Sequence, residues 1–150
     1  MLRYSALLLA LLTVSAAAQQ GQRDFPRIVP HDWRIAANEK SHTWRAVSPG
    51  NDAWLSLYAT PVRRPLSDHL QRWGVNAGDR VTYRRREQDW GVVSGYTADR
   101  RIFYRETMLA CGARQWHNLE FEYPLSDKGR MDTFVTRAAH ALGAYSSAGC

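Results

Sequence analysis

Four strand-like runs follow one another in the second half of the chain with only short joins between them. The joins read REQD, ADR and ACGAR, which are polar and too short to hold a crossover helix. Successive strands must therefore pair as antiparallel neighbours, and this constrains the chain to a mainly antiparallel sheet. The runs are Asp79–Arg86, Trp90–Ala98, Arg101–Ala110 and Gln115–Tyr123.

A further hairpin and two helical patterns accompany these strands. The hairpin turns at Ser48–Asp52, between a short strand containing Trp44 and the segment AWLSLYA. A short helix is predicted in PLSDHLQRWG, between a proline start and a glycine stop. A long C-terminal helix is predicted over Pro124–Tyr145, where an amphipathic stripe is formed by Met131, Phe134, Val135, Ala138, Ala139 and Leu142.

The fold class follows from how apolar residues are distributed in the strands. In RIFYRETML both alternating sets of side chains include apolar residues, so both faces of the sheet need to be covered at least in part. We therefore expect an α+β fold, in which a mainly antiparallel β-sheet is flanked by a short helix and a long C-terminal helix.

The N-terminus has the features of a secretory signal peptide. Arg3 precedes an apolar run, and Ala16 and Ala18 form an A-x-A cleavage site before Gln19. The run is too short to cross the roughly 30 Å apolar core of a bilayer as a helix. We expect a signal peptide at residues 1–18, a flexible lead at 19–40, and a single α+β domain at 41–150 that is periplasmic or secreted.

Two cysteines remain after the predicted cleavage, Cys111 and Cys150. In a chain bound for an oxidising compartment they predict a disulfide that staples the C-terminal tail. The alternative is a reactive thiol, but the sequence has no C-x-x-C pair and no cation beside Cys150 that would lower its pKa.

The order of segments resembles a known superfamily. The motifs are W-x-V-V-S-G at Trp90–Gly95, F-Y at Phe103 and Tyr104, and E-Y-P at Glu122–Pro124. They are similar to those of small exported bacterial domains of unknown function related to the PsbP-like (DcrB-like) α/β/α sandwich superfamily. The resemblance extends from residue 41 to 142 and implies a fold with a non-catalytic binding or assembly role. It supplies no catalytic residues and no cofactor.

A small periplasmic hydrolase is the alternative function. Ser94 lies between glycines in GVVSG, but it is fourth in the motif and inside a strand, whereas a nucleophile elbow places serine third on a strand-to-helix turn. A histidine–carboxylate pair is the other possible machinery, with His117 the histidine that a strand positions. None of the five histidines forms H-x-H or H-x-x-x-H with another, so we expect no metal site.

The basic hairpin is the candidate binding surface. The chain has a formal net charge of +6, and YRRRE lies beside several aromatic residues, a combination that suits single-stranded nucleic acid. Interspersed acidic residues and the predicted export argue against nucleic acid as the ligand. An unknown envelope protein or an anionic envelope component suits the compartment better. Because side chains alternate along a strand, the predicted contact residues are Arg84, Arg86 and Arg101.

Overall fold

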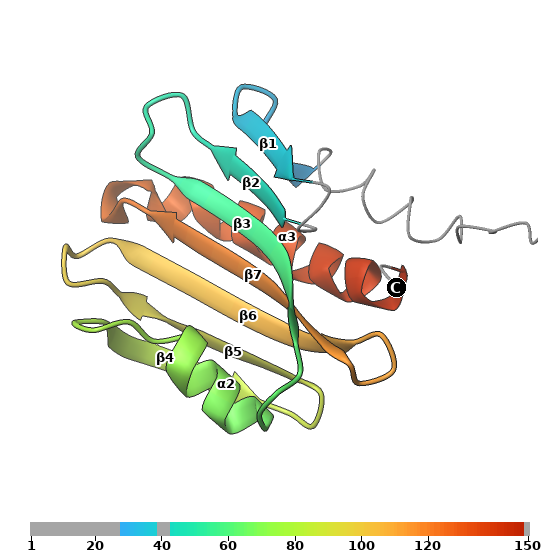
Figure 1. Ribbon diagram of the computed structural model, residues 1–150. Coiled ribbons are helices and arrows are strands. Elements are labelled where there is room, and N and C mark those ends of the chain that lie inside the picture. The colour runs from blue at the N-terminus through green and yellow to red at the C-terminus, as the bar shows by residue number, and fades with distance from the viewer. Residues whose placement is uncertain (1–27, 39–42, 149–150) are drawn as a thin grey trace, which may run out of the picture.

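The protein folds around one sheet with a helix on each face. The computed structural model describes residues 28–38 and 43–148. Within these residues, α2 lies in front of the sheet and α3 runs behind it (Figure 1). The strands are β1 (Arg34–Asn38), β2 (Thr43–Val47), β3 (Trp54–Pro61), β4 (Arg80–Arg86), β5 (Trp90–Tyr96), β6 (Ile102–Ala110) and β7 (Gln115–Tyr123). The helices are α2 (Leu66–Trp73), the 3-10 turn η2 (Leu125–Asp127) and α3 (Lys128–Ala148).

This arrangement confirms the predicted α+β class with a short and a long C-terminal helix. The seven strands are antiparallel throughout, in the order β1-β2-β3-β7-β6-β5-β4. The four strands predicted as successive neighbours, β4 to β7, do pair in sequence order. The last strand, β7, also pairs with β3, so the N-terminal hairpin and the β4–β7 meander form one continuous sheet.

The ordered domain begins earlier than residue 41. β1 and the buried Trp33 lie within residues 19–40, which we expected to be a flexible lead. The Trp33 ring meets the ring of Phe134 on α3 edge to face, with 5.5 Å between centroids. The described part of this segment therefore contributes to the core, because β1 extends the sheet and Trp33 closes one end of the helix-covered face. Residues 1–18, the predicted signal peptide, lie outside the described residues.

The main core lies between the sheet and α3. Alternate residues of β3, β6 and β7 point to this side, and the helix stripe predicted from the sequence packs onto them. Phe121 on β7 meets Phe134 edge to face, with 5.1 Å between ring centroids. α3 contacts mainly β6 and β7 and so covers the middle of the sheet. The outer strands β4 and β5 extend beyond the helix on this face.

α2 covers part of the opposite face of the sheet. Leu66 and Leu70 of α2 are buried against Trp116 of β7. Gly95 allows a close approach of β4 to β5, because a Cβ added there would overlap the carbonyl oxygen of Arg80. The register of the two strands shifts beside this point, as expected for a bulge.

A buried ion cluster joins the sheet to the loop after α2. Arg105 on β6 is only 1% exposed at its side chain and donates to Asp79 Oδ2 at 2.5 Å and to Glu120 Oε1 at 2.8 Å. It also donates to the carbonyl oxygen of Gly74, the C-cap of α2, at 3.0 Å. The arginine therefore pairs with two carboxylates and holds the end of α2 on the sheet.

The predicted disulfide is left as a prediction, because Cys150 lies outside the described residues. Cys111 occupies the β6–β7 turn with a positive φ of 56°. No described helix is both long and apolar enough to cross a membrane.

Candidate functional site

The three predicted basic contact residues do not form one cluster. Arg84 and Arg86 lie on the exposed edge strand β4, where the Arg84 guanidinium donates to Gln71 Oε1 on α2 at 3.3 Å. Arg101 lies beyond the other end of β5, opposite Thr97, about 13 Å from Arg84 and about 20 Å from Arg86 along the strand at 3.3 Å per residue. Its Nε donates to Glu122 Oε1 at 2.6 Å, so an ion pair already engages its charge.

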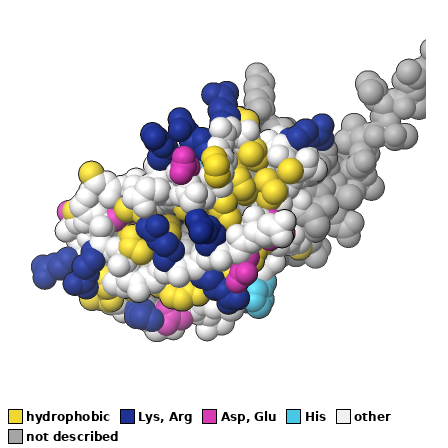
Figure 2. Space-filling view, turned by 90° about the horizontal axis from the view of Figure 1, so that it is seen from below, with side chains coloured by type: hydrophobic (Ala, Val, Ile, Leu, Met, Phe, Trp, Pro, Cys, Tyr) yellow, Lys and Arg dark blue, Asp and Glu magenta, His cyan; other side chains and the backbone are white. Residues whose placement is uncertain are grey.

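The view onto the α2 and β4 edge agrees with this separation. Figure 2 shows dark blue Lys and Arg side chains in several separate groups, with yellow hydrophobic side chains between them. The local charge is thus distributed over the face, and the basic hairpin does not present a continuous cationic track.

Ser94 and His117, the two residues named for the alternative hydrolase, lie on different strands, β5 and β7. Ser94 Oγ donates to the backbone carbonyl of Phe103 at 2.8 Å, which orients the hydroxyl along the sheet. His117 is fully buried on β7, and its Nε2 lies 3.8 Å from Cys111 Sγ and 3.4 Å from Gln115 Oε1. Among the described residues, no cluster of His, Cys, Asp and Glu could hold a metal ion.

A groove on the α3 face is the best-formed candidate site. It lies where β4 and β5 extend past α3, and it consists of two adjoining cavities of about 520 and 280 Å³. The two cavities share Tyr104, Val135 and Thr136 in their walls. A volume in this range suits a small organic molecule or the apolar part of a larger one.

The larger cavity has an apolar and aromatic lining with one acid in it. From the sheet it is lined by Tyr83, Trp90, Val92, Tyr104, Glu106 and Met108, and from α3 by Val135, Thr136, Ala139, His140 and Gly143. Glu106 is only 6% exposed. We call this cavity the Glu106 pocket.

The acid is held by a tyrosine from the same strand. Tyr104 Oη donates to Glu106 Oε2 at 2.6 Å. Burial raises the pKa of the Glu106 carboxyl above its ordinary value, although the Tyr104 bond and the nearby His140 work against this shift. Burial beside the acid also raises the pKa of the Tyr104 hydroxyl far above its usual value. The Glu106 carboxyl is therefore harder to ionise in this pocket than an exposed glutamate would be.

Cations at the border of the groove already have anionic partners. Arg85 lies over the Trp90 ring, 5.3 Å from the centroid, and donates to Glu87 Oε1 at 3.0 Å. At the other end, Lys128 pairs with Asp132 at 2.7 Å. Neither pair places a cation against Glu106, so the buried acid and the rim charges are separate features.

This pocket was not predicted from the sequence. One alternating set of β6 reads Ile102, Tyr104, Glu106 and Met108, so a carboxyl stands in an otherwise apolar and aromatic series on the face that packs against α3. An acidic residue at a position where the pattern requires an apolar one was the signal that could have indicated a functional site.

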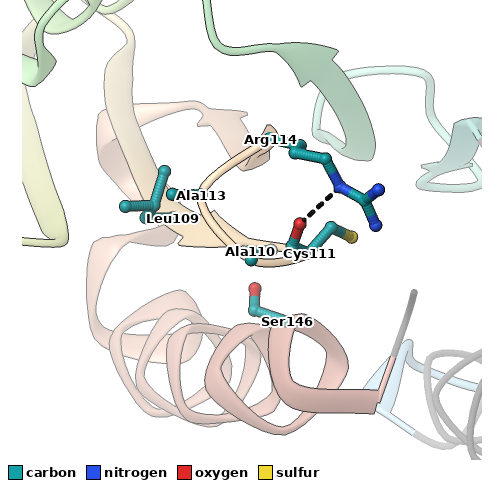
Figure 3. A pocket seen from close by; sticks show the side chains of 7 residues that line it. Leu109, Ala110, Cys111, Ala113, Arg114 and Ser146 are labelled. Carbon is teal, nitrogen blue, oxygen red and sulfur yellow. Dashed lines mark hydrogen bonds between the residues drawn. The ribbon is translucent and has the colours of Figure 1, made fainter.

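A third cavity lies at the β6–β7 turn and offers less chemistry. It measures about 700 Å³ and is lined by the turn and by Ser146 of α3. Figure 3 shows Arg114 turned back over the turn, with its Nε donating to the carbonyl oxygen of Cys111 at 2.9 Å. Arg114 therefore stabilises the turn through this hydrogen bond.

Comparison with known proteins finds no matching family model and no matching curated protein.

Proposed function

We propose that this chain is an exported, non-catalytic binding or accessory module of the cell envelope, which holds an apolar portion of its ligand in the groove between α3 and β4–β5. The observation that carries the proposal is the Glu106 pocket, with aromatic walls and a single buried acid. Apolar lining with few polar groups is typical of a binding cleft.

Export and fold family are parts of the same proposal. The arginine, apolar run and A-x-A site at the N-terminus support export to the periplasm or outside the cell. The motifs that resemble the PsbP-like sandwich fall in β5, at the start of β6 and at the end of β7, as expected for residues that support a sheet. Ser94 Oγ donates to the backbone carbonyl of Phe103, which does not support the alternative of a hydrolase that uses this serine.

Ligand binding in the groove is tested with Nile red, an apolar dye whose emission rises when it leaves water. We expect the purified protein to enhance its fluorescence and Thr136→Trp to weaken binding at least about tenfold, because the indole would fill the groove. The matched control is Thr133→Trp, on the same helix and equally exposed but outside the lining. Equal binding by the two variants, or no enhancement by the wild type, would refute the proposal.

A second control separates the groove from the basic edge strand. Replacing Arg84 and Arg86 by glutamate should leave dye binding unchanged, because Arg84 is directed toward Gln71 on the opposite face and neither residue lines the groove. Loss of dye binding in this variant would place the site at the edge strand instead.

A further inference from the structure

Glu106 is a buried acid whose pocket contains no Lys or Arg, and the base nearest in effect to its carboxyl is His140 on α3. Its described neighbours in the sheet are Val92 on β5 and Leu119 on β7, which are both apolar. Its one hydrogen bond in the structure comes from Tyr104 Oη, whereas a carboxylate has about four lone-pair positions that accept. The lining of its pocket includes no Lys or Arg.

The same pocket offers several aromatic faces. Tyr83, Trp90 and Tyr104 come from three neighbouring strands and line one cavity with the acid. Tyr83 is 52% exposed, which is unusual for a large aromatic residue in this chain. Aromatic faces attract cations, and they do so more strongly when the cation is removed from water.

We infer that the Glu106 pocket binds an organic ammonium cation, whose charged group pairs with the Glu106 carboxylate and whose apolar chain lies along the groove. This inference rests on the proposed function, since it identifies the class of ligand for the same groove. The charge complementarity is specific, because an ammonium ion would supply a full positive charge, which among the lining residues only His140 could provide, and would also meet the aromatic faces.

Binding of such a cation is linked to proton release. Burial raises the pKa of Glu106, whereas an ammonium group would pair with the ionised carboxylate. Affinity should therefore rise as the pH increases through the folded pKa of Glu106. The other titratable groups that face the pocket are Tyr104 on β6, Tyr83 on β4 and His140 on α3, while Arg85 lies nearby over Trp90.

The test is displacement of Nile red by three ligands with the same chain length, below their micelle concentrations. Octylammonium chloride should displace the dye at a concentration about tenfold lower than octan-1-ol or octanoate, as a charge-assisted hydrogen bond predicts. Glu106→Gln should remove this preference, measured as the ratio of the three displacing concentrations within the variant. Glu87→Gln is the matched control, because Glu87 is an exposed glutamate that pairs with Arg85 outside the pocket.

The ligand series on the wild-type protein decides the question even if Glu106→Gln does not fold. An octanoate preference, or equal displacement by all three ligands, would refute the ammonium inference while leaving the groove as a binding site. Failure of the dye to bind at all would instead refute the proposed function. The rise of octylammonium affinity with pH should persist in His140→Gln, and its loss there would assign the titration to His140 and overturn the role of Glu106.

Discussion

Asp79→Ala should destabilise the fold strongly, because it breaks the buried ion cluster around Arg105. The side chains of Asp79 and Arg105 are 3% and 1% exposed, and their charged atoms are 2.5 Å apart. Asp79 Oδ2 also accepts from the backbone N–H of Asn76 at 2.8 Å. Removal of Asp79 leaves the buried guanidinium with Glu120 as its remaining acidic partner and takes away the acceptor at 2.5 Å.

The expected loss is about 3 kcal/mol, the lower end of the range for breaking a buried pair, because Glu120 still contacts Arg105 after the substitution. With a urea dependence of about 1.5 kcal/mol per molar, the unfolding midpoint should fall by about 2 M. The control is Glu87→Ala, whose partner Arg85 is 57% exposed at its side chain, so its loss should be below about 1 kcal/mol.

Urea unfolding followed by tryptophan fluorescence and circular dichroism measures both variants. Adding Arg105→Met to Asp79→Ala should add less destabilisation than Arg105→Met causes alone, because the first substitution has already removed part of what Arg105 binds. If Asp79→Ala shifts the midpoint no more than Glu87→Ala, the cluster is solvated and the reasoning from its burial fails.

Two further predictions concern a close strand contact and the half-buried histidine His69. Gly95→Ala should lower the free energy of unfolding by about 1–3 kcal/mol, because its methyl group would overlap the facing strand. Gly129→Ala, whose added Cβ meets no neighbouring atom within 4 Å, should leave this free energy unchanged or raise it by up to about 1 kcal/mol. Thermal unfolding compares the two variants. The reverse order would contradict the bulge. Burial lowers the pKa of His69 below its ordinary 6.5, so near pH 6 the unfolded chain binds more protons and stability should fall as the pH drops through 6.5. Chemical unfolding between pH 5 and 8 measures this effect, and the free energy of unfolding should decrease less steeply with falling pH in His69→Gln than in the wild type. If the free energy depends on pH equally in the two proteins, His69 is not the cause.

The elements themselves could be predicted because their signals are local. The turns at REQD and ACGAR connect strands that pair through them, and the stripe containing Phe134 and Leu142 identifies the face of α3 that packs on the sheet. In each case residues close in sequence determine the result, since a short turn brings its two strands together and helical periodicity gathers apolar side chains on one face.

The sites could not be predicted in this way, as the basic residues and the acid illustrate. The alternation of side-chain direction along β4 correctly placed Arg84 and Arg86 on the face opposite to that of Arg85. It could not place Arg101, which lies at the far end of the neighbouring strands and forms an ion pair with Glu122. Glu106 looked like one of several charges in a basic region, whereas it is buried at the base of the groove.

By itself, the sequence determined the antiparallel meander, the two helices and which face of each is apolar. Only the tertiary structure decided that β7 pairs with β3, that β1 belongs to the sheet, and that α3 covers β6 and β7 but leaves β4 and β5 beyond it. The lateral position of the helix depends on how Phe121, Phe134 and Trp33 fit together across the core. Close packing of side chains far apart in sequence sets that position, and the groove with its buried acid is the space it leaves.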